Sequence, residues 1–236
     1  MREHNSPNMV HVCTLEAADI VLVHTRHSLW ASIIRLGTHC YWNHAAIVCR
    51  AAGAGHPYKG ALLVDAKTDG GMEIRPAEYY LDNPDKYAVG VKRLDASWER
   101  MYPGTERHLL GNVCNLAIGE VPINLGLPIV ERFDKALRQI TVVLRFLRRK
   151  LGRVSCPASP PWNTRPIEVK AFTCAGFVQW CYYVAASKAL NCGENAVPRE
   201  LVFNQRVKNR VSLLELLTTT PADLAKCATL SWKYLG

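Results

Sequence analysis

The sequence has no uninterrupted apolar run that could cross a membrane. A membrane-spanning helix needs about 18 or more consecutive apolar residues, and no stretch of the 236 residues approaches that length. Residues 1–11 are polar and partly charged, so the apolar run of a secretory signal peptide is also missing. We therefore expect a product that is made soluble in the cytoplasm, and any export would need a dedicated secretion system.

The nine cysteines include no C-x-x-C pair and no close cluster with histidine of the zinc-finger kind. Their number is odd and their spacing irregular, which favours reduced thiols over a disulfide framework. Most of them are expected to be small buried residues, because free cysteine is among the most buried residue types. We predict no metal site and no cofactor.

Acidic residues are the scarcer charges. The chain has 20 Asp and Glu against 29 Lys and Arg, a formal charge of +9 and a sequence pI near 9.2, which favours anionic partners. Apolar residues make up 49% and charged residues 21%, enough for a sizeable core. This composition excludes a disordered tail, a collagen and a disulfide mini-protein.

Alternating short apolar runs and helix signals indicate an α+β fold, with a small antiparallel sheet packed against helices. Strands are predicted at residues 19–25, 44–49, 61–66 and 87–94, with a further one starting at Met72. Helices are predicted at residues 29–37, 76–81 and, weakly, 97–119, and a last helix opens at Thr220 with Pro221 in its first turn. We expect residues 1–15 to be a tail and residues 16–236 to form one domain, in which residues 95–165 are a helical insertion.

Residues 129–151 form the most periodic stretch of the chain. Apolar residues recur there at steps of three and four, which predicts one apolar helical face. Between residues 130 and 153 eight basic residues stand against two acidic ones, a net charge of +6. Two interpretations are open: a packed helix with a solvated basic face, or a lid or side wall of the substrate site that meets an anionic substrate or membrane surface.

Cys174 lies at a predicted helix start, directly after Thr173, a good N-cap residue. The positive end of a helix dipole and its unpaired N–H groups favour a thiolate and can bind an oxyanion. The alternative is a buried structural thiol, because Cys181 lies seven residues on, along the same helical face.

His44 opens an apolar strand directly after Tyr41 and Trp42, at the mouth of the expected core. If the strands at 44–49 and 61–66 pair about a turn near residue 55, His44 comes opposite residue 66 or close to it. Asp65 would then orient the imidazole, as the acid of a Cys-His-acid triad does. The register decides this, because a slip of one residue places Asp65 on the other face of the sheet.

Short motifs in a fixed order resemble the circularly permuted, papain-like hydrolases of the NlpC superfamily, in particular the YiiX/YaeF group. In chain order they are Asp19-Ile-Val-Leu-Val, an apolar helix, Tyr41-Trp42-Asn43-His44-Ala-Ala-Ile-Val, Val64-Asp65-Ala66, Phe172-Thr173-Cys174 and Thr220-Pro221-Ala222-Asp223-Leu224. The chain departs from the group at Ala18, where Gly is usual, at Asn43, where a small residue is usual, and at Asp65, where Glu is common. The resemblance does not touch residues 95–165.

The resemblance implies a permuted papain-like fold with Cys174 as nucleophile, His44 as base and Asp65 as the acid. Tyr41, Trp42 and Thr173 are the predicted substrate-binding residues. We expect a hydrolase that cleaves an amide bond of peptide or peptidoglycan type. A lipid acyl hydrolase or acyltransferase acting at membranes, and a non-enzymatic basic module that binds lipid or nucleic acid, are the alternatives. No nucleic-acid motif is visible, so nucleic acid is not the expected partner.

Overall fold

A computed structural model describes most of the chain. The described residues are 13–28, 31–32, 35–36, 40–66, 72–120, 173–193, 196–204 and 216–233. The predicted basic helix at residues 129–151 lies outside them and stays a prediction.

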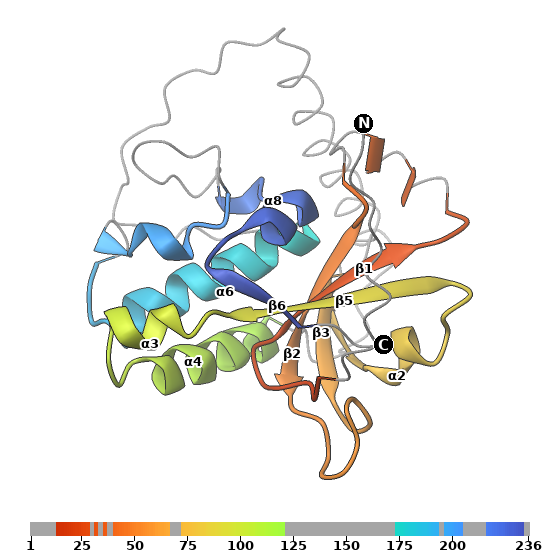
Figure 1. Cartoon of the computed structure of the whole chain (residues 1–236). Coiled ribbons are helices and arrows are strands. Elements are labelled where there is room, and N and C mark those ends of the chain that lie inside the picture. Colours follow the sequence, from red (N-terminus) through yellow and green to blue (C-terminus); the bar gives the residue numbers. More distant parts are fainter. Residues whose placement is uncertain are drawn as a thin grey trace, which may run out of the picture.

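The fold is α+β, built on a six-stranded sheet in which every neighbouring pair is antiparallel (Figure 1). The sheet order is β4-β3-β2-β1-β5-β6. Its strands are β1 (Ile20–Thr25), β2 (His44–Arg50), β3 (Leu62–Ala66), β4 (Met72–Pro76), β5 (Tyr87–Leu94) and β6 (Leu230–Lys233). The helices are α2 (Glu78–Leu81), α3 (Ser97–Met101), α4 (Glu106–Gly119), α6 (Cys174–Ala189) and α8 (Pro221–Lys226), with a 3-10 turn, η2, at Arg199–Leu201.

The predicted strands, the hairpin and the α+β class are confirmed, and β5 has the predicted bounds. In the segment predicted as a helix at residues 29–37, the described residues 31–32 and 35–36 are helical. The weakly helical stretch at residues 97–119 is two helices, α3 and α4. β6 was not predicted. Its four residues, Leu-Ser-Trp-Lys, are too short for a recognisable alternation.

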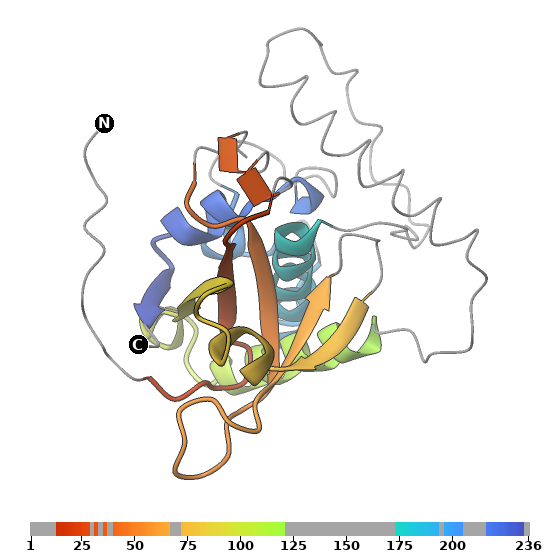
Figure 2. The same cartoon turned by 90° about the vertical axis from the view of Figure 1, so that its right-hand side faces the viewer.

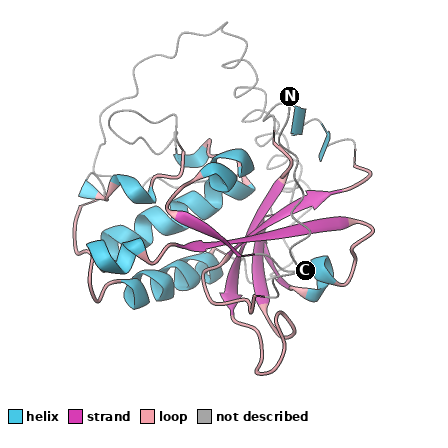
Figure 3. Cartoon of the chain, viewed as in Figure 1, coloured by secondary structure: helices cyan, strands magenta, loops and turns pink. Residues whose placement is uncertain are grey.

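Two apolar clusters lie on the two faces of the sheet, and Figure 3 shows helices, in cyan, on both sides of the magenta strands. On one face, alternate residues of β1 and β2, including Ile20 and Ile47, pack with residues of α4 and α6. On the other face, the intervening residues, including Val21 and Val48, pack with Tyr80 of α2. This alternation follows from the two-residue period of a strand that is buried on both sides.

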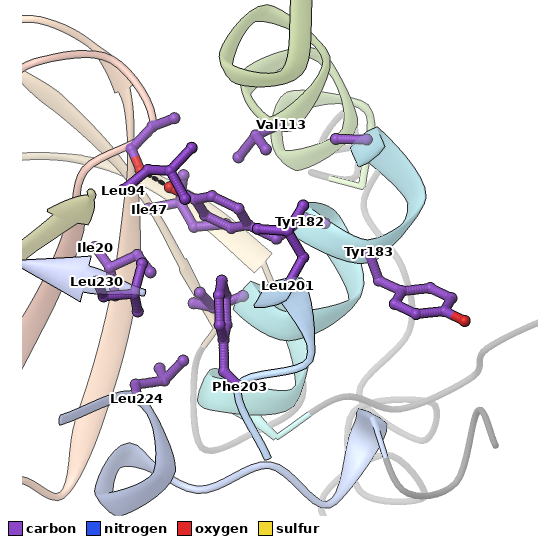
Figure 4. Packing of buried hydrophobic residues seen from close by; sticks show 14 of the residues in the cluster. Ile20, Ile47, Leu94, Val113, Tyr182, Tyr183, Leu201, Phe203, Leu224 and Leu230 are labelled. Atoms are coloured by element: carbon purple, nitrogen blue, oxygen red, sulfur yellow. Dashed lines mark hydrogen bonds between the residues drawn. The ribbon is translucent and has the colours of Figure 1, made fainter. Parts of the chain in front are cut away.

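α6 is the central helix of the larger cluster and runs beside β2 (Figure 2). The ring of Tyr182 points from α6 toward Ile47 of the sheet (Figure 4), and its hydroxyl donates to the Ala18 carbonyl at 2.6 Å. Buried Gln179 bridges to the segment around Phe203, donating to Leu201 O at 2.7 Å and accepting from Phe203 N at 2.5 Å. These contacts fix the position of α6, and therefore of its first residue, against the sheet.

Of the helical insertion predicted at residues 95–165, the structure describes α3 and α4. Trp98 of α3 and Leu109 and Val113 of α4 are buried in the larger cluster, where α4 packs against α6. These two helices are therefore part of the core. The rest of the segment, from residue 121 on, lies outside the described residues.

In the part of the chain that the structure describes, no helix combines the length and apolar character required to cross a membrane.

Candidate active site

The start of α6 is held by its N-cap. The Thr173 hydroxyl oxygen accepts from the Gly176 N–H at 2.9 Å, as predicted for this residue, and the hydroxyl donates to the Leu217 carbonyl at 3.1 Å. A Cβ on Gly176 would lie 2.3 Å from that carbonyl oxygen, so only glycine allows the approach. Cys174 therefore begins a helix whose first turn is pinned to the segment before α8.

The start of β2 is equally well defined. Asn43 is buried, and its side-chain oxygen accepts from the Thr25 N–H at 2.7 Å, while its backbone N–H donates to Val23 O at 3.1 Å. These bonds fix the backbone immediately before His44, whose Cα pairs with that of Val23 of β1. Asn43 is thus a strand-anchoring side chain.

The structure brings His44 and Asp65 together through a register that the sequence did not reveal. Ala46 pairs with Asp65, so Asp65 lies diagonally across from His44 on the same face of the sheet. On the turn side of a β-bulge between Val48 and Arg50, Arg50 pairs with Leu62, and that register would place Asp65 opposite Ile47, on the other face of the sheet; the bulge shifts the pairing by one residue. Because of this shift, Asp65 Oδ1 reaches His44 Nε2 at 2.5 Å.

Cys174 lies near the imidazole of His44. The two side chains are close enough for each to shift the pKa of the other. Since Nε2 of His44 is taken by Asp65, Nδ1 is the nitrogen that remains for the thiol. The structure thus brings together the three residues predicted as a triad, and the His44 side chain keeps 18% of its surface exposed.

The electrostatics of the site favour an ion pair. Burial raises the pKa of the Cys174 thiol, but the His44 imidazolium and hydrogen bonds to the sulfur outweigh it and lower that pKa below its ordinary value. Burial likewise lowers the pKa of His44, but the Cys174 thiolate and Asp65 carboxylate raise it well above its ordinary value. A thiolate beside an imidazolium is the reactive state of a nucleophilic cysteine.

Other described cysteines behave in the opposite way. Burial raises the pKa of each of five thiols, those of Cys13, Cys40, Cys49, Cys114 and Cys181. Cys181, seven residues from Cys174 on α6, is fully buried in the core. The two cysteines of α6 therefore have different environments, one structural and one polarised by a base.

Two residues that the sequence analysis missed contact the second carboxylate oxygen of Asp65, the one that does not face His44. The Tyr80 hydroxyl donates to Asp65 Oδ2 at 2.5 Å, and Arg75 Nε lies 3.2 Å from the same oxygen. Burial raises the pKa of Asp65, but the charge of His44 and hydrogen bonds from His44 and Tyr80 lower it below its ordinary value. Nothing in the sequence distinguishes Tyr80 from its neighbour Tyr79, so only the fold could reveal this contact.

The first turn of α6 also offers an oxyanion donor. The Gly176 N–H donates to the Thr173 hydroxyl oxygen. Among the described residues, none accepts from the N–H of Cys174 itself. At a helix start such an N–H is left without an intrahelical acceptor and can donate to a developing negative charge.

The three predicted substrate-binding residues have different surroundings. Thr173 is committed to the helix cap. Trp42 is partly buried and packs over Gly90, where a Cβ would lie 2.7 Å from the Trp42 ring. Tyr41 stacks on His24 with a centroid separation of 3.9 Å. It is 40% exposed, which makes it the most exposed of the three residues.

Within the described ranges, no group of three or more His, Cys, Asp or Glu residues is arranged to hold a metal ion. A scan against protein-family models and a search of curated proteins gave no match to this chain.

Proposed function

We propose that the protein is a cysteine-dependent hydrolase that cleaves an amide bond of peptide or peptidoglycan type. The observation that carries the proposal is the arrangement of the Cys174 sulfur, the His44 ring and the Asp65 carboxylate, together with the opposite pKa shifts of Cys174 and His44. A buried structural thiol has no use for a paired imidazole.

The chemistry follows from the positions of these groups. The Cys174 thiolate attacks the substrate carbonyl carbon, and the N–H of Cys174 donates to the oxyanion that forms. His44 then gives its Nδ1 proton to the leaving amine as the C–N bond breaks, which leaves an acyl-enzyme on Cys174. The neutral ring next takes a proton from water, the hydroxide attacks the acyl carbon, and the thiolate leaves while Asp65 stabilises the imidazolium.

The order of the elements supports the same proposal. A nucleophile at the start of α6 packs against an antiparallel sheet whose strands carry the base and the acid earlier in the chain. This order of His, acid and Cys is that of the permuted papain-like hydrolases of the NlpC superfamily, to which the sequence motifs are similar. The resemblance favours amide substrates, and a lipid acyl ester is the alternative that the same chemistry could serve.

The test is to incubate the wild-type protein and Cys174→Ala with peptides, peptidoglycan fragments and phospholipids, and to identify products by mass. We expect hydrolysis of amide-containing substrates by the wild type and loss of turnover in the variant. Cys181→Ala is a matched control, because it removes a thiol from the same helix without touching His44. Products from lipid alone would redirect the proposal to acyl esters, and equal turnover by wild type and Cys174→Ala would refute it.

A further inference from the structure

The carboxylate of Asp65 is held through both of its oxygens. Oδ1 faces His44 Nε2 at 2.5 Å, and Oδ2 accepts from the Tyr80 hydroxyl at 2.5 Å. Arg75 Nε lies 3.2 Å from Oδ2. Because the side chain of Asp65 is 4% exposed, water cannot easily replace these partners if the carboxylate turns. The orientation of the group that holds His44 is therefore set by what binds Oδ2.

Tyr80 is itself fixed in place. Tyr80 is only 5% exposed. Its ring packs edge to face against the rings of Tyr79 and Tyr87, each at a centroid distance of 5.0 Å. The backbone at the start of α2 is anchored to the sheet region, since the Ala77 N–H donates to Ala61 O at 3.0 Å. The hydroxyl is thus aimed at Oδ2 by a packed ring on an anchored turn.

Tyr80 is also the dedicated partner of Asp65. Arg75 is shared, because it pairs with Glu73 as well and its guanidinium lies 4.1 Å from the centre of the Tyr79 ring. Glu73 is the cross-strand neighbour of Asp65, and Arg75 offsets the repulsion between these two carboxylates. Burial and the negative charge of Asp65 raise the pKa of Tyr80 above its ordinary value, so its hydroxyl stays a donor.

We propose that Tyr80 is a positioning residue for the thiol chemistry: its hydroxyl fixes Asp65 so that the imidazole of His44 presents Nδ1 to Cys174. The inference rests on the proposed function, since it gives Tyr80 a role only if the Cys174 and His44 pair is reactive. The titratable and charged groups around Asp65 are His44 from β2, Glu73 and Arg75 from β4, Tyr79 and Tyr80 from α2, and Tyr87 from β5. The substitution Tyr80→Phe removes the hydroxyl that donates to Asp65 and keeps the packed ring.

The experiment measures the rate of Cys174 alkylation by iodoacetamide as a function of pH in the wild type, Tyr80→Phe and Tyr87→Phe. Tyr87→Phe is the matched control, because the Tyr87 hydroxyl donates to Tyr79 at 3.3 Å and is not hydrogen-bonded to Asp65. In Tyr80→Phe a less firmly held Asp65 stabilises the imidazolium less, so the thiolate forms at higher pH. We expect the acid limb of the profile to move up by about half a pH unit or more, and the control to match the wild type.

A second measurement separates positioning from general damage. The proton on His44 Nε2, strongly hydrogen-bonded to Asp65, should give a far-downfield NMR signal that weakens or shifts in Tyr80→Phe and persists in Tyr87→Phe. If Tyr80→Phe does not fold, Arg75→Gln tests the same oxygen, with a smaller shift of the same sign expected. An unshifted limb and signal in a folded Tyr80→Phe overturn the inference, whereas a wild-type Cys174 that alkylates no faster than an ordinary thiol overturns the proposed function instead.

Discussion

Two opposing effects act on the imidazole of His44. Burial lowers its pKa, while the Cys174 thiolate and the Asp65 carboxylate raise it, and the outcome is a pKa well above the ordinary value of 6.5. The neighbours of His44 therefore favour its charged form. Since the folded-state pKa is raised, this charge contributes stability below the unfolded pKa, and the contribution is lost as the pH rises through the folded pKa.

The first prediction concerns the contribution of the Cys174 charge to the raised pKa of His44. In Cys174→Ala the negative charge beside the ring is gone, so the titration midpoint of His44 should fall, and with it the upper pH limit of the charged form. The measurement is an NMR titration of the His44 ring protons in wild type and variant. A midpoint that stays in place would show that the sulfur does not carry the charge that the account assigns to it.

The second residue-scale prediction concerns the acid. Asp65→Asn keeps the shape of the side chain but removes the counter-charge of the imidazolium, so turnover should fall by about 10²-fold or more. Asp85→Asn, at an exposed carboxylate away from the site, should leave turnover unchanged. The two variants are compared by steady-state kinetics at one pH, with circular dichroism to check the fold. Full activity of Asp65→Asn would mean that another group orients His44.

At the scale of elements, the start of α6 positions Cys174, the proposed nucleophile. The Thr173 cap and the close approach of Gly176 to Leu217 O tie the first turn to the chain before α8. α8 is itself defined by a capping box between Thr220 and Asp223, with Pro221 in its first turn. The position of Cys174 therefore depends on how closely the first turn of α6 approaches the chain at Leu217.

Gly176→Ala tests this approach. Alanine favours a helix over glycine by about 1 kcal/mol, but here its Cβ would lie 2.3 Å from a backbone oxygen, so we expect a net loss of stability of about 1–3 kcal/mol. Gly111→Ala is the matched control on α4, because nothing lies within 4 Å of its added Cβ, and it should gain up to about 1 kcal/mol. Denaturant unfolding measures both changes. Equal effects at the two sites would show that the close approach is absent in solution.

The sheet shows why the sequence predicted some elements and missed others. Helix starts at Thr173 and Thr220 depend on the cap residue itself, and a strand such as β5 has its own apolar pattern, so local residues were enough. The pairing of His44 with Asp65 depends on a bulge between Val48 and Arg50. A bulge is a property of two paired strands, and neither strand's sequence marks it.

At the scale of the whole molecule, the site joins distant parts of the chain. Asp65 and His44 come from neighbouring strands, Tyr80 from α2 and Cys174 from the helix that follows the segment outside the described residues. The sequence analysis selected Cys174, His44 and Asp65 as candidate site residues from their local settings and a family resemblance, and the folded chain brings them together. It could not find Tyr80 and Arg75, because their role comes only from their distance to Asp65 in the folded chain.

The central claim is that one cysteine among nine is a thiolate paired with His44. The most direct measurement is alkylation of the folded protein by iodoacetamide at pH 6, with the labelled cysteines identified by peptide mass mapping in wild type and His44→Ala. The account predicts that Cys174 reacts faster than every other cysteine, by on the order of tenfold or more, and that His44→Ala removes this advantage. Slow, uniform labelling of the nine cysteines, or fast labelling of Cys174 that persists in His44→Ala, would contradict it.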